Sequence, residues 1–78
     1  MSQHTLTIHD TITSTDRRVS IDIQHHGDEW RFVAHFEGQG EVLASGQNLW
    51  FTREEDVLAL AHERVREAMR KRDPRAFF

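Results

Sequence analysis

The sequence contains no cysteine, no tyrosine, only one proline and four glycines. Without cysteine the chain can form neither a disulfide nor a thiolate metal site, which fits a reducing compartment. No apolar run approaches the roughly 18 residues that a membrane span needs, and the first ten residues, MSQHTLTIHD, lack the basic-then-apolar pattern of a signal peptide. We therefore expect a cytoplasmic protein.

A chain of 78 residues is near the small end of what folds as one domain, and we expect residues 1–78 to form a single domain. Without disulfides, so small a domain depends on its core, on a metal with non-thiolate ligands, or on self-association. The net charge of −3 argues against nucleic-acid binding over the whole surface. The charge is uneven, however, because six of the ten basic residues lie within residues 64–75.

Apolar residues alternate with polar ones in the first half of the chain, which is typical of half-buried strands. The alternation predicts four strands at about 4–12, 18–26, 30–37 and 41–45. In the first strand Leu6, Ile8 and Ile12 share one face and Asp10 breaks the pattern. The second strand presents Val19, Ile21 and Ile23, and the third presents Trp30, Phe32, Ala34 and Phe36.

Two loops predict how these strands pair. A tight turn at Gly27-Asp28, of type II′ or I′, places Ile23, Ile21 and Val19 opposite Phe32, Ala34 and Phe36. A three-residue loop, 38–40, then pairs Phe36 with Val42 and Ala34 with Ala44. The segment Gly46-Gln47-Asn48 is expected to end the fourth strand.

The C-terminal third predicts a helix over about 53–72. Thr52 and Glu55 have the spacing of a capping box. Acidic residues at the start and basic residues at the end suit the helix dipole. An apolar stripe follows at helical spacing, formed by Val57, Leu58, Ala61, Val65, Ala68 and Met69. We therefore predict an α+β fold, a four-stranded antiparallel meander with one amphipathic helix packed on one face (β-β-β-β-α).

The six histidines offer a possible site on the outer face of the sheet. One register of the first hairpin aligns His9, Ser20 and His35, and a shift of two residues places His9 opposite Asp22. Either row would suit a metal or acid–base role. We favour solvated polar residues instead, because a metal site usually needs three converging ligands. No catalytic motif is complete, so we expect no enzyme activity and no cofactor.

Surplus apolar surface suggests a partner. Val33 and Leu43 interrupt the polar outer face, and Trp50, Phe77 and Phe78 lie at the two ends of the helix. One short helix is too small to cover all of them, which points to self-association or a partner protein, unless Trp50 and the C-terminal tail fold over the edge of the core.

A second reading starts from the basic end of the helix. These side chains could contact phosphates, and the candidates are Arg66, Arg70, Lys71, Arg72 and Arg75. Interleaved acids, Glu63, Glu67 and Asp73, favour an ordinary solvated helix face instead.

Residues 30–69 resemble the small antitoxin domains of the HicB type, in which a short antiparallel sheet precedes a capped helix. The resemblance rests on residues 30–34, on the turn at Gly46, and on Thr52, Glu54 and Glu55 with the alanines of the helix. The family places a helix between its strands, which this chain lacks. We expect a non-enzymatic protein-interaction or regulatory module (an inhibitor, immunity protein, antitoxin or accessory subunit) that forms a homodimer; the alternative is a nucleic-acid-binding protein.

Overall fold

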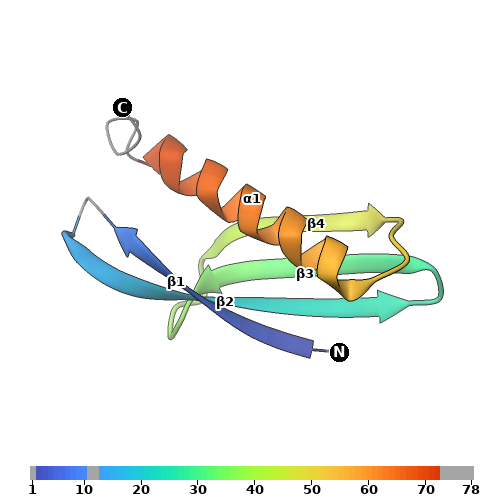
Figure 1. Cartoon of the computed structure of the whole chain (residues 1–78). Helices are drawn as coiled ribbons and strands as arrows, with labels where there is room; N and C mark the ends of the chain where they lie inside the picture. The colour runs from blue at the N-terminus through green and yellow to red at the C-terminus, as the bar shows by residue number, and fades with distance from the viewer. Residues whose placement is uncertain (1, 11–12, 73–78) are drawn as a thin grey trace.

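The computed structural model describes residues 2–10 and 13–72 and shows one sheet with one helix across it (Figure 1). The strands are β1 (Ser2–Asp10), β2 (Thr15–His26), β3 (Glu29–Phe36) and β4 (Val42–Leu49), followed by α1 (Glu54–Arg72). All pairings are antiparallel and the strand order is β1-β2-β3-β4. The predicted α+β meander with a C-terminal helix is therefore confirmed.

The hairpin of β2 and β3 has the register that its turn and its apolar pattern predict. Ile23 pairs with Phe32, Ile21 with Ala34 and Val19 with Phe36. His26 pairs with Glu29, which leaves a two-residue turn at Gly27-Asp28. Gly27 has φ +59° and Asp28 is not in the positive region, which fits a type II′ turn.

The hairpin of β1 and β2 has a different register from either one predicted. His9 pairs with Asp16 and Asp10 with Thr15, whereas we expected His9 opposite Ser20 or Asp22. Asp10 lies on the same face as Leu6 and Ile8 and is fully buried. It is paired across the strands, because Nη1 of Arg17 lies 3.1 Å from its Oδ2.

The same guanidinium also closes one end of the apolar core. Its Cζ lies 3.6 Å from the centroid of the Phe36 ring, within the range of a cation–π contact. Arg17 therefore satisfies Asp10 and covers Phe36 at once, which explains how a carboxylate can lie on the inward face of β1. Ile12, predicted to share this face, lies outside the described residues.

β4 departs most from the prediction. Ala34 pairs with Ala44 as expected, but Val42 pairs with His35 instead of Phe36 because the register shifts there. The strand also continues to Leu49, through the segment expected to end it, with a second shift between Trp30 and Phe32. Asn48 has φ +57°, so the residue read as a strand breaker lies inside an irregular strand.

Gly46 allows β4 to pass close to the core. A Cβ at this position would lie 2.5 Å from Cε1 of Phe32, which is only 1% exposed. Phe32 therefore fills the space that a side chain of residue 46 would need. Gly46 is required by packing rather than by its backbone angle.

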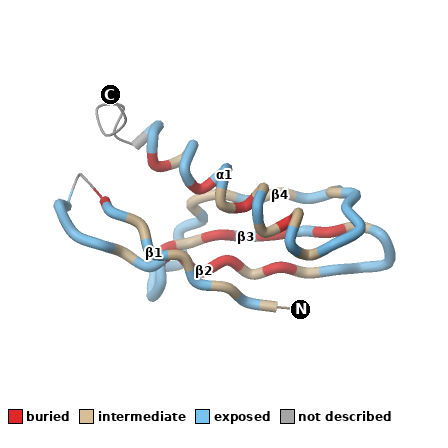
Figure 2. Tube along the Cα trace, viewed as in Figure 1, coloured by how far each residue is buried: buried red, intermediate tan, exposed pale blue. Residues whose placement is uncertain are grey.

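The core lies between the sheet and the inward stripe of α1 (Figure 2). Four helix residues are buried: Val57, Ala61, Val65 and Met69. Leu58 and Ala68, predicted for the same stripe, are half-buried. At the end of the core opposite Arg17, the His25 ring stacks on the Trp30 indole with centroids 3.7 Å apart, and Nε1 of Trp30 donates to the carbonyl of Phe51 at 2.8 Å.

The start of α1 is held by β1 instead of by the predicted capping box. Among the residues that the structure describes, no hydrogen bond joins Thr52 to Glu55. Instead the hydroxyl of Ser2 donates to Oε1 of Glu54, and Nε2 of His4 lies 3.4 Å from Oε2 of the same carboxylate. The first turn of the helix is therefore attached to the outermost strand.

The close approach of Gly46 to Phe32 predicts that G46A destabilises the fold. The added methyl group must displace a buried ring, which costs about 1–3 kcal/mol in the free energy of unfolding. Urea denaturation followed by circular dichroism measures this loss. G40A is the matched control, because a Cβ there meets no heavy atom within 4 Å, and it should change stability little. Equal effects of the two substitutions would contradict the packing argument.

Candidate functional site

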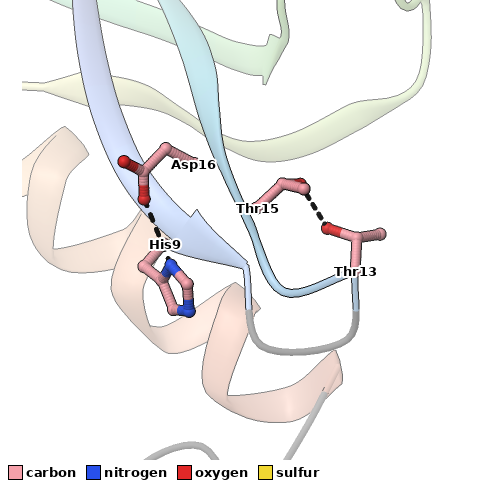
Figure 3. Close-up of polar contacts among 4 residues, drawn as sticks. All are labelled: His9, Thr13, Thr15 and Asp16. Atoms are coloured by element: carbon pink, nitrogen blue, oxygen red, sulfur yellow. Dashed lines mark hydrogen bonds and ion pairs between the residues drawn. The ribbon is translucent and has the colours of Figure 1, made fainter.

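The predicted histidine row does not form. In the observed register Ser20 lies between Thr5 and His35, and its Oγ accepts a hydrogen bond from Nε2 of Gln3 at 2.9 Å. His9 lies at the far end of the hairpin, where its Nδ1 is 3.1 Å from Oδ1 of Asp16 (Figure 3). Both side chains of that pair are largely exposed, so water weakens the interaction.

A second imidazole–carboxylate pair lies on the outer face. Nε2 of His35 is 3.5 Å from Oδ2 of Asp22, and its Nδ1 is 3.1 Å from the carbonyl of Phe36. Within residues 2–10 and 13–72, no group of three His, Cys, Asp or Glu side chains could hold a metal ion. The two pairs are thus separate two-residue contacts, each without a third converging ligand in that part of the chain.

The outer face of the sheet carries an open hollow of about 860 Å³. Its floor comes from the middle of β2, β3 and β4, and Arg64 of α1 reaches its rim around the edge of the sheet. Both charge signs are present in its lining, which includes Arg31 and Arg64 as well as the Asp22–His35 pair. The lining is polar apart from Val33 and Phe32, so the hollow suits a polar surface of a partner better than an apolar ligand.

The apolar residues predicted for a partner surface are not all together. Val33 is on the outer face and 39% exposed, but Leu43 is half-buried against the core on the helix side. The reason is the register shift in β4, which makes Val42, 54% exposed, the neighbour of His35 instead. Phe77 and Phe78 lie outside the described residues.

Trp50 is the most exposed large apolar side chain among the described residues, at 70%. It lies between Leu49, which ends β4 opposite Trp30, and Phe51, whose carbonyl accepts the hydrogen bond from the Trp30 indole. Phe51 is itself 36% exposed. The sequence indicated Trp50 as a partner residue but gave no sign that Phe51 and Val42 would also be exposed.

The basic residues of the helix are partly dispersed. Arg66, Arg70 and Lys71 are exposed, the side chain of Arg72 is not described, and Arg75 lies outside the described residues. Arg64 is turned toward the sheet, and its Nη1 donates to the carbonyl of Ser45 at 3.1 Å. Lys71 and Arg64 flank Glu67 along a shallow hollow between β4 and α1, so positive charge is interrupted there.

No family model, no curated protein and no solved structure matches this chain. The functional argument therefore rests on the chain's own residues. Within residues 2–10 and 13–72, no helix has the length and the apolar composition that crossing a membrane requires.

Among the described residues, two groups on α1 have shifted pKa values, Glu54 in its first turn and His62 near its middle. The hydrogen bond from Ser2 lowers the pKa of Glu54 below 4.5, and His4 acts in the same direction. Burial lowers the pKa of His62 below 6.5, and the charges of Arg66 and His4 lower it further. Both groups take up a proton more readily in the unfolded chain than in the folded one.

We therefore predict that acidification destabilises the protein. The contribution of His62 to the free energy of unfolding is present above pH 6.5 and is lost as the pH falls below that value toward the pKa of His62 in the folded chain. The contribution of Glu54 is lost below pH 4.5. Melting temperatures measured between pH 8 and pH 4 should fall over these windows. H62Q should flatten the part of the fall that begins below pH 6.5. Parallel profiles for the wild type and H62Q would refute this assignment.

Proposed function

We propose that the protein is a non-enzymatic protein-interaction module that acts in the cytoplasm as a small regulator, such as an inhibitor, an immunity protein, an antitoxin or an accessory subunit. It also associates with a second copy of itself. The observation that carries the proposal is the 70% exposure of Trp50 at a fixed position beside the core.

Exposure of Trp50 fits a binding role because tryptophan is enriched among the residues that dominate interface energies. Its neighbours on both sides are held: Leu49 by pairing with Trp30, and Phe51 by the indole hydrogen bond of Trp30. A tryptophan presented from a held backbone loses little conformational entropy when it enters a partner's pocket. Phe51 extends the apolar surface next to it.

The polar hollow on the outer face supports the same function. Transient interfaces combine apolar anchor residues with polar surface, and the chain offers both, in Trp50 and in the lining of the hollow. Arg31 and Arg64 supply donors for carboxylates, while Asp22 supplies an acceptor. The partner surface that fits is therefore mixed in charge and carries a pocket for an indole ring.

The decisive variant is W50A. Partners are isolated with the tagged protein from its native host, identified, and then purified for calorimetric titration against the wild type and the variant. We expect W50A to weaken binding by about 30-fold or more, which corresponds to the loss of a hot-spot side chain. Its fold should be unchanged, because the side chain is largely outside the core.

R66A is the matched control, since Arg66 is exposed on the helix away from Trp50. It should leave the affinity of a protein partner unchanged. A partner bound equally well by W50A and the wild type would remove the Trp50 surface from the proposal.

Nucleic-acid binding through Arg66, Arg70 and Lys71 is the alternative proposal. Because counterion release strengthens such binding at low salt, titration with mixed DNA and RNA at about 50 mM salt gives it the best conditions. Salt-dependent binding that R66A weakens and W50A does not would favour this alternative over a protein partner.

A further inference from the structure

The two outer strands of the sheet differ in regularity. β1 pairs with β2 through an uninterrupted run of nine residue pairs, from Ser2 to Asp10. β4, on the opposite edge, has two register shifts, and Arg64 of the helix donates to the carbonyl of Ser45. Bulges and covering side chains are common means by which a protein prevents strand addition at an edge.

Over Gln3–His9 of the described structure, β1 has neither a register shift nor a backbone group bonded by a side chain. Its sequence, SQHTLTIHD, contains no proline, lysine or arginine, and its one acidic residue is Asp10 at the end. Among the described residues, no hydrogen bond outside the β1–β2 ladder involves a backbone group of Gln3–His9. The backbone groups on the far side of a strand remain available to another strand.

The helix also leaves the outer side of β1 open. α1 packs mainly over β4 and β3 (Figure 1), and it reaches β1 through Glu54, which Ser2 and His4 contact. Leu6 and Ile8 face the helix side but are only half-buried.

We propose that β1 pairs antiparallel with β1 of a second copy, about a two-fold axis at Leu6, to form one continuous sheet. The proposal rests on the self-association included in the proposed function. In this arrangement Leu6 lies opposite Leu6 of the other copy, and the other pairs are Thr5 with Thr7, His4 with Ile8, and Gln3 with His9, so the pairing stops before the fully buried Asp10.

A second copy fits this edge because the strand is complementary to itself about that axis. No pair brings two like charges together, and Thr5 and Thr7 form the Thr–Thr pairs that stabilise antiparallel sheets. On the helix side, Leu6 of one copy meets Leu6 of the other, and each Ile8 lies opposite His4 and diagonal to that Leu6, which covers their exposed surface. A one-residue change of register would place these apolar residues opposite the threonines of the outer face.

Substitutions that introduce charge at the β1 edge test the arrangement. The variant T5K/T7K places four lysines around the axis, and T5E/T7E places four glutamates there. The dissociation constant of the dimer should rise at least about tenfold for each variant alone, because like charges face one another in both pairs of residue 5 with residue 7. An equimolar mixture should regain a dimer of one chain of each kind, seen by native mass spectrometry. Circular dichroism and thermal melting establish that the separate variants are folded.

The double variant S45K/Q47K on β4 is the matched control, and its dimer affinity should equal that of the wild type. Sedimentation of wild-type protein up to about 1 mM as a pure monomer would overturn both the pairing and self-association, and would leave binding through Trp50 standing. A dimer that S45K/Q47K disrupts and T5K/T7K does not would overturn the β1 pairing alone. A mixture that stays monomeric beside a dimeric wild type would do the same.

Discussion

The fold depends on how one helix covers a four-stranded sheet. The buried stripe of α1 is narrow, with alanine at its centre and valine or methionine around it, and it packs mainly over β4 and β3 and more weakly over β2. Polar side chains cover the two ends of the apolar core that this stripe does not reach. Arg17 lies over Phe36 at one end, and His25 stacks on Trp30 at the other. The chain thereby forms a closed core although only 37% of its residues are hydrophobic.

The irregular course of β4 links this core to the candidate surface. Gly46 lets the strand approach the ring of Phe32, and the register shifts on either side alter which side chains face outward. One shift brings Val42 to the outer face and Leu43 to the core. The other precedes the segment that carries Trp50. The same packing constraint that fills the core therefore also arranges the apolar residues available to a partner.

Sequence reasoning succeeded where a turn and an apolar pattern agreed, and failed where polar residues faced inward. The two-residue turn at Gly27-Asp28 leaves only one register that pairs Ile23 with Phe32, and the structure has it. The β1–β2 register was wrong because the second strand was expected to begin at about residue 18, whereas β2 begins at Thr15, which pairs with Asp10. Asp10 had been read as a break in the apolar face, but Arg17 on β2 satisfies it. In β4, Gly46 and Asn48 resembled strand breakers, and period-two alternation misplaced Leu43. Sequence reasoning accordingly predicted the exposure of Val33 and Trp50 and missed that of Val42 and Phe51, and a partner role for these residues stays a prediction.

The bulges of β4 also limit how far the sheet can grow. A sheet with two regular edges can add copies at both, and repeated addition of that kind produces open fibrils. Here only β1 forms a regular edge. Pairing through β1 would use the regular edge of both chains, and the irregular β4 would then lie at each outer edge of the combined sheet. In the proposed pairing through β1, growth of the sheet would therefore stop at a closed pair, because the irregular β4 would form both of its outer edges.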